Sequence, residues 1–183
     1  ACSSVLNNHY LADLQFQAMK QIGPIEFTDA ELDFAEKINR LYSSADPSDL
    51  FGELKIPADQ KERVDRLYGA PLIGENFPSM DAEVIGTGST DVGDVSWITP
   101  LSMLETACFP TGAAGHSWGI AATSGMSIGH KGMLHAAATM ALTAVRLYSE
   151  PTHWEMVRRE FRDRTEKVPY VNPIPEGVNP PTP

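Results

Sequence analysis

Hydrophobic positions recur every three or four residues in the first part of the chain. This spacing covers residues 9–22, which follow a pair of asparagines able to cap a helix and end at a Gly-Pro pair. It returns over residues 28–42, whose start carries the Thr28-x-x-Glu31 pattern of a capping box. The pattern therefore predicts two amphipathic helices near the N-terminus.

The longest helical pattern lies between residues 130 and 149, and a shorter one follows from Pro151 to Arg164. Proline is well suited to the first turn of the last helix. The long segment is rich in alanine, which favours close contact with a sheet or another helix. Five residues are predicted to form its buried seam: Met133, Ala137, Met140, Ala144 and Leu147. A short, highly charged helix is also predicted over residues 57–68, with a solvated polar face.

Strand patterns occupy the middle of the chain. Residues 91–99 show mixed alternation of apolar and polar positions, residues 101–109 form an apolar run, and residues 84–85 are a possible strand start. Combined with the helices, these segments predict an α/β fold with a mixed sheet and flanking helices. Residues 1–167 are expected to form one domain portion, and the proline-rich residues 168–183 an extended tail.

Composition narrows the classes of function. The 183 residues carry a net charge of −10, which argues against nucleic acid or an anionic membrane as a partner. Two cysteines give no disulfide framework and no zinc-cysteine spacing, so a reducing, cytoplasmic location is expected. No apolar run is long enough to cross a bilayer, and no GxSxG, P-loop, GxGxxG or CxxC motif occurs.

His130 is the first candidate for chemistry because it stands where a glycine-rich loop becomes the long helix. The positive end of a helix disfavours the imidazolium, and neutral imidazole is the form that binds a metal. The alternative is a histidine that only caps or packs at this boundary. The neighbouring Lys131 is either a contact for an anionic substrate group or an exposed first-turn lysine. His135 is rotated off the face of His130 and is expected to be structural or to orient a ligand from behind.

Two further candidates lie upstream. His116, in GAAGHSW, is placed to donate a hydrogen bond to a substrate carboxylate or a developing oxyanion. Its alternative is a loop histidine packed against Trp118. Asp91, in STDVGD, is placed to orient a histidine or a metal without binding the metal itself. Its alternative is an Asx turn before a strand.

Taken together, the segments GSTDVGDVSWITP, GAAGHSWGIAATSG and GHKGMLHAAATMALTA resemble the metal-dependent amidohydrolases of the M20 peptidase family. GPIEFTDAELDFAEKI, near the N-terminus, resembles the same family, so the likeness covers nearly the whole chain. The resemblance implies an α/β, zinc-peptidase-like catalytic domain interrupted by a lid domain that supports dimerisation. This chain is similar to the C-terminal part of that catalytic domain.

The resemblance also implies two divalent ions, zinc or manganese, that activate a water to attack the amide bond of an N-acyl amino acid such as an aroyl-glutamate. His130 corresponds to the family's last metal-ligating histidine, Asp91 to an acidic position near the site, and His116 to a loop on the substrate side. The histidine-x-aspartate motif, the paired glutamates and the lid histidine of the family are absent from this sequence.

This difference from the family leads to two hypotheses. In the first, the chain supplies no catalytic residue and is inactive without the remaining half of the catalytic domain, because a catalytic metal needs about three protein ligands. A homo-oligomer is expected for the complete enzyme. In the second, the chain is a non-catalytic binding or structural module that retains relic site residues.

Overall fold

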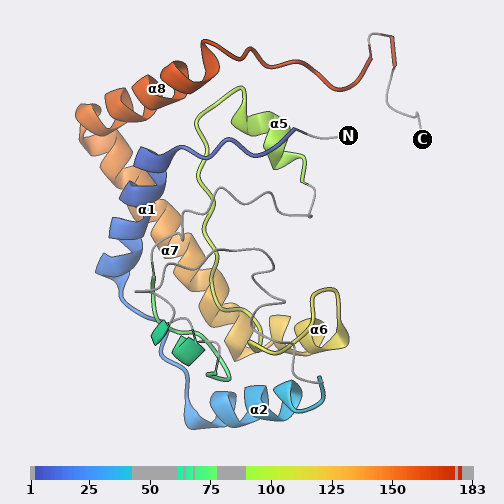
Figure 1. The fold of residues 1–183 in the computed structure, drawn as a ribbon. Coiled ribbons are helices and arrows are strands. Elements are labelled where there is room, and N and C mark those ends of the chain that lie inside the picture. The colour runs from blue at the N-terminus through green and yellow to red at the C-terminus, as the bar shows by residue number, and fades with distance from the viewer. Residues whose placement is uncertain are drawn as a thin grey trace. The chain divides into compact units, whose positions relative to one another are not determined.

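The structure is a computed structural model that describes residues 3–42, 62–63, 65–67, 69–77, 90–175 and 177–178. The described chain is helical and divides into two compact units, each built from separate stretches of sequence. Helices α1 and α7 each contribute residues to both units. The helices are α1 His9–Ile22, α2 Asp29–Asn39, α5 Val92–Ser96, α6 Trp118–Ser124, α7 Ser127–Ser149 and α8 Pro151–Thr165 (Figure 1).

The first unit consists of Ala1–Leu14, Ile85–Met103 and Val145–Pro183. Polar contacts between the start of α1 and α8 hold it together. Asn8 caps α1 by accepting a hydrogen bond from the Leu11 amide at 2.9 Å, and its side-chain amide donates to the Val157 carbonyl at 2.9 Å. The carboxylate of Glu160 accepts from the backbone amides of residues 9 and 10, each at 2.8 Å. The unpaired amides of the first turn of α1 are therefore satisfied by Asn8 and by Glu160 of α8.

The second unit consists of Gln15–Val84 and Leu104–Ala144. Its core is small and centres on three buried residues, Ala35 of α2, Leu72 and Ile128 of α7. Four partly buried residues pack around them: Phe27, Leu32, Phe34 and Met126. The start of α2 carries the capping box, since the Thr28 hydroxyl accepts from the Glu31 amide and the Glu31 carboxylate accepts from the Thr28 amide. This cap fixes the entry of α2 into the core.

The structure confirms the helices predicted at both ends of the sequence. Helix α1 has the predicted bounds, α2 begins at the predicted capping box, and α8 begins at Pro151. Of the charged helix predicted over residues 57–68, residues 62–63 and 65–67 are helical and the rest lies outside the described residues. Helix α6 was not predicted, because its glycine and small residues matched neither a helical nor a strand pattern.

The predicted α/β fold with a mixed sheet is wrong for the described residues, which contain no strand. Residues 91–99 were expected to be a strand, but Val92–Ser96 form the short helix α5. Gly93 lies so close to the Ser3 carbonyl that a Cβ there would be 2.0 Å from the oxygen, and the Ser96 hydroxyl donates to the Gly93 carbonyl at 2.5 Å. Local hydrogen bonds and close packing therefore decide this segment.

Residues 101–109 were expected to form a second strand and are instead extended without a ladder. Their strand-like pairing is one isolated parallel bridge between Leu101 and Asn7. Further along, the segment runs beside α7 (Figure 1), where the Thr106 hydroxyl donates to the Gly132 carbonyl at 3.0 Å. An apolar run becomes a strand only when a neighbouring strand accepts its backbone hydrogen bonds, and the described residues provide none.

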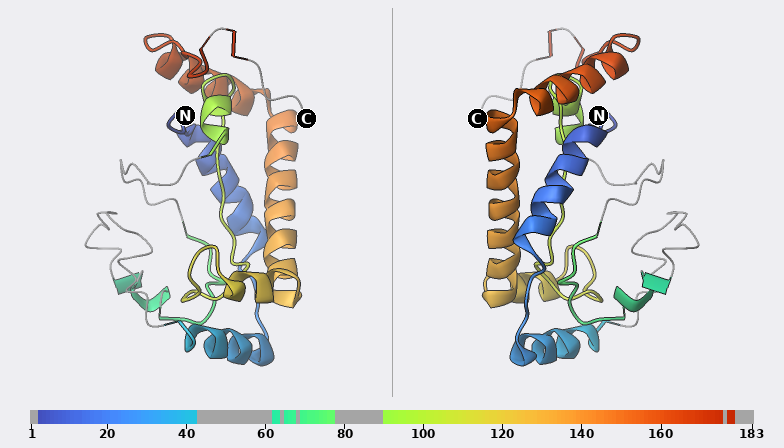
Figure 2. Two further views of the ribbon diagram at one scale, coloured as in Figure 1. Left: turned by 90° about the vertical axis from the view of Figure 1, so that its right-hand side faces the viewer. Right: turned by 90° about the vertical axis from the view of Figure 1, so that its left-hand side faces the viewer.

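The buried seam predicted for α7 is also wrong. Met133 and Met140 are 58% and 55% exposed. The face that is buried follows a different set of positions: Ile128, Gly129, Gly132, His135, Thr139 and Thr143. Figure 2 shows the length of α7 from two sides. The spacing of apolar residues thus predicted the helix correctly and its buried face incorrectly.

Two remaining predictions concern the tail and the membrane. The tail is held at its aromatic start, where the Tyr170 hydroxyl donates to Asp94 at 3.2 Å. The domain boundaries at residues 1–167 and 168–183 stay a prediction, as does the strand start at residues 84–85, which lies outside the described residues. Within the part of the chain that the structure describes, no helix has the length and apolar character needed to cross a membrane.

Candidate functional site

The junction between α6 and α7, in the second unit, positions His130. The chain turns tightly here, because the Met126 amide donates to the Thr123 carbonyl at 3.2 Å and the His130 amide donates to the Met126 carbonyl at 2.9 Å. A Cβ at Gly129 would lie 2.3 Å from the Ser124 carbonyl oxygen. Only glycine permits this approach, so Gly129 fixes the first turn of α7 against the end of α6.

His130 itself is exposed on the first turn of α7. Among the described residues, its imidazole has no hydrogen-bond or ion-pair partner. The metal-ligand role and the alternative of a histidine that only caps or packs at this boundary both stay predictions. The exposed side chain is accessible to a ligand.

His116 lies in the loop before α6, in the same unit. It is exposed, and its backbone is left-handed with φ of 56°. The aromatic ring that stacks on Trp118 is Tyr42, with ring centroids 5.7 Å apart, so the packing partner expected for His116 is taken. The structure leaves the His116 side chain in solvent, without a described polar partner.

Tyr42 is a positioning residue that sequence reasoning missed. Its hydroxyl donates to the Ser117 hydroxyl at 2.9 Å and accepts from the Gly119 amide at 2.7 Å. A Cβ at Gly119 would lie 2.6 Å from the same hydroxyl oxygen. The loop that bears His116 is thus tied to the residues after α2. In the sequence, Gly119 indicates a close contact after Trp118 but does not identify Tyr42 as the residue in contact.

Asp91 belongs to the first unit, where it is exposed and precedes α5 without a side-chain capping bond. Within the described residues of its unit, no hydrogen bond joins Asp91 to a histidine. The carboxylate that does gather partners is Asp94, which accepts from the amide and hydroxyl of Ser3 at 3.2 and 2.7 Å and from Tyr170. The hydrogen bonds from Ser3 lower the pKa of Asp94, against an opposing effect of desolvation.

Lys131 and Glu31 form an ion pair in the second unit. The Lys131 ammonium donates to Glu31 Oε2 at 2.6 Å and to the Glu26 carbonyl at 2.8 Å. The Glu31 side chain is 7% exposed. Burial raises its pKa, but the hydrogen bonds donated by Lys131, Ser127 and Thr28 outweigh burial and lower the pKa from 4.5 to about 2. Lys131 is therefore paired with Glu31 of α2. This differs from both predictions for it, a contact with an anionic substrate group and an exposed first-turn lysine.

His135 is buried on the inner side of α7. Its Nε2 lies 2.8 Å from the Gly23 carbonyl oxygen and donates to it, while Nδ1 has no partner among the described residues. The imidazole joins α7 to the end of α1. This contact agrees with the structural one of the two roles expected for His135.

The described residues do not fit a complete metal centre. No group of three or more histidine, cysteine, aspartate or glutamate side chains in the described stretches is placed to hold an ion. Of the three predicted site residues, His116 and His130 lie in the second unit and Asp91 in the first. The arrangement offers open imidazoles at defined backbone positions, and no catalytic step follows from these residues alone.

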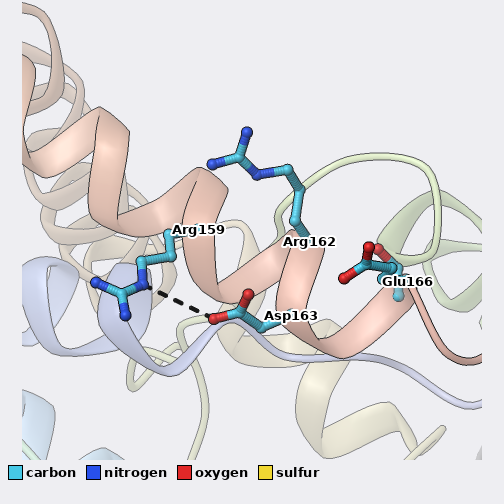
Figure 3. A pocket seen from close by; sticks show the side chains of 5 residues that line it. Arg159, Arg162, Asp163 and Glu166 are labelled. Carbon is cyan, nitrogen blue, oxygen red and sulfur yellow. Dashed lines mark ion pairs between the residues drawn. The ribbon is translucent and has the colours of Figure 1, made fainter.

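A shallow depression of about 500 Å³ lies along α8 in the first unit. Figure 3 shows that its charged side chains do not converge: Arg159 reaches toward Asp163, 3.9 Å away, and Arg162 points elsewhere. Opposite charges that pair along one exposed helix are typical of a solvated surface. The depression is not a candidate site.

Comparison with known proteins identifies a relative, one of the subunits of p-aminobenzoyl-glutamate hydrolase from Escherichia coli (strain K12). The chain is 34% identical to it over 182 residues, or 98% of the chain's length. The predicted resemblance is thereby confirmed, and the chain is related to a hydrolase. The aligned residues span 38% of that relative's length. No family model matches the chain, and no solved structure matches it.

Proposed function

We propose that this chain forms part of a metal-dependent amidohydrolase that cleaves the amide bond of an N-acyl amino acid such as an aroyl-glutamate. The observation that carries the proposal is the 34% identity to a subunit of p-aminobenzoyl-glutamate hydrolase, which extends over 98% of the chain. The relative's name supplies the substrate class.

In this proposal His130 supplies one ligand to a centre of two divalent ions, zinc or manganese. Its exposed imidazole, free of described partners, is suited to that role. Such a centre would polarise the amide carbonyl and activate water. The other ligands must come from polypeptide beyond the described residues, which hold no ligand cluster. The chain by itself is proposed to be inactive.

His116 and Asp91 take supporting roles in the same proposal. The left-handed backbone at His116 and the Tyr42 anchor hold this imidazole in solvent, where it is able to donate to a substrate carboxylate or oxyanion. Asp91 is exposed and is proposed to orient a ligand from behind. The complete enzyme is proposed to form a homo-oligomer.

The test uses this chain produced together with the polypeptide that supplies the rest of the enzyme. We expect hydrolysis of p-aminobenzoyl-glutamate that requires zinc or manganese, and no turnover by the chain alone. His130→Ala should lower kcat/KM by more than about 100-fold and reduce the bound metal, because a ligand is lost. His9→Ala removes an exposed histidine on α1 and is the matched control.

Unchanged metal content and turnover in His130→Ala would remove its assigned role. The second candidate function, a non-catalytic binding module, is favoured by one observation: α7 exposes Met133, Leu134 and Met140. That function would be supported if the assembled protein bound a partner tightly but neither retained metal nor cleaved the amide.

A further inference from the structure

Trp118, the first residue of α6, presents a large aromatic surface beside the loop that bears His116. Its side chain is 56% exposed. One face of the indole stacks on the ring of Tyr42, with the ring centroids 5.7 Å apart and the ring planes inclined by 26°. Because that face is covered and more than half of the side chain is still exposed, the opposite face of the indole is open to solvent.

The backbone on both sides of Trp118 is fixed by the same tyrosine. The Tyr42 hydroxyl donates to the Ser117 hydroxyl at 2.9 Å and accepts from the Gly119 amide at 2.7 Å. These bonds tie the residues immediately before and after Trp118 to the chain that follows α2. A binding group that is immobilised before the ligand arrives loses less entropy on binding. The indole is therefore held in position in advance of any ligand.

Trp154, on α8 in the first unit, is an exposed tryptophan in a different setting. Its side chain is 46% exposed, and the guanidinium of Arg158 lies over the ring, 5.9 Å from the centroid. This cation already interacts with the negative face of the indole. Among the described residues, the exposed tryptophan that is supported by a stacked aromatic ring is Trp118.

His116 gives the surroundings of Trp118 a second kind of binding group. The two residues are two positions apart, so their Cα atoms are separated by at most about 7 Å. The His116 side chain is exposed on a left-handed backbone. An aroyl-glutamate has an aromatic ring at one end and carboxylates at the other, with the amide between them. A free indole face and a nearby imidazole donor match these two ends.

We propose that Trp118 determines specificity for the acyl group, because the open face of its indole stacks on the aromatic ring of the aroyl-amino acid. The inference rests on the proposed function. Stacking is favourable for a flat aromatic ring, and an aliphatic acyl group has no equivalent interaction. This contact therefore selects aroyl over aliphatic acyl substrates. It strengthens binding of the ring and leaves binding of the amino-acid half unchanged.

The two products of aroyl-glutamate cleavage test the two halves of the substrate separately. p-Aminobenzoate carries the ring, and glutamate is the amino-acid half. Isothermal titration calorimetry measures the Kd of each for the assembled protein, whether or not that protein cleaves the amide. Trp118→Leu should raise the Kd of p-aminobenzoate by roughly 10-fold and leave that of glutamate within about twofold. Trp118→Phe restores an aromatic ring and should recover most of the affinity for p-aminobenzoate.

Trp154→Leu is the matched control, because it removes a tryptophan of similar exposure from α8. It should change neither Kd, and circular dichroism verifies that each variant keeps its helices. A p-aminobenzoate Kd that Trp118→Leu leaves unchanged would overturn the proposal. Equal weakening of both products would also overturn it, because a disturbed loop has that effect. So would a lack of p-aminobenzoate binding to the unmodified protein.

Failure of this proposal is distinguishable from failure of the proposed function. If the assembled protein cleaves the amide with zinc or manganese but binds p-aminobenzoate equally well without Trp118, the function stands and the role of Trp118 is wrong. If it cleaves no amide but binds p-aminobenzoate through Trp118, the aromatic site stands and the proposed function is contradicted.

Discussion

Helices α2 and α7 share a core but bury different kinds of residue. In α2 the buried positions include Ala35 and Ile38, and a capping box closes the first turn. In α7 only the first turn buries a large apolar residue, Ile128, which packs with Ala35 and Leu72. Beyond it, the buried face is polar and the exposed face apolar. Helix α2 buries apolar positions within its unit. Helix α7, in contrast, has an apolar side that lacks a partner among the described residues.

The largest expected effect tests where the two helices meet. Ile128→Ala removes a fully buried side chain from the core that α2 and α7 share. We expect the free energy of unfolding to fall by about 2–4 kcal/mol, since such a change leaves a cavity. Urea unfolding followed by circular dichroism measures it. A loss below about 1 kcal/mol would mean that the core does not depend on this contact.

The next effect concerns the pair that links α2 to α7. Glu31→Gln removes the charge that accepts from Lys131 and weakens the capping box. The expected loss is roughly 2–3 kcal/mol at neutral pH, because a partly buried lysine partner and a cap are affected together. Glu36→Gln on the same helix is the control. Its partner Arg40 is exposed, so the loss should stay below about 0.5 kcal/mol.

The same pair gives stability a pH dependence. The pKa of Glu31 is about 2 in the folded chain against an ordinary value of 4.5. A carboxyl with a lowered pKa stabilises the fold fully above 4.5, and this contribution is lost as the pH falls toward 2. We expect a loss on the order of 3 kcal/mol across that window, absent from Glu31→Gln. Equal pH profiles for both proteins would contradict the assignment.

Sequence reasoning succeeded where local signals were sufficient. The capping box at Thr28 located the start of α2, and Pro151 located the start of α8. It failed where the outcome depends on distant partners. Residues 101–109 had a strand's composition but no neighbouring strand among the described residues. Val92–Ser96 form a helix in close contact with Ser3.

In the candidate site, too, local sequence signals were informative and contacts between distant residues were missed. The glycine-rich segment correctly indicated a helix start near His130, where Gly129 packs closely on Ser124. The contacts of Tyr42 with the His116 loop and of Lys131 with Glu31 were not predictable, since each joins residues at least 75 positions apart. In α7 the predicted seam of apolar residues left out Thr139, whose hydroxyl donates to the His135 carbonyl and so allows burial.

The smallest effect is expected on the apolar side of α7. Met140→Gln replaces one flexible side chain with a polar one of similar length at a position 55% exposed. In the isolated chain, the free energy of unfolding should change by less than about 0.5 kcal/mol, because little apolar surface leaves contact with protein. The measurement is the same urea titration used for Ile128→Ala. A loss of about 2 kcal/mol would show that this side is already packed within the chain, and the contrast with α2 would disappear.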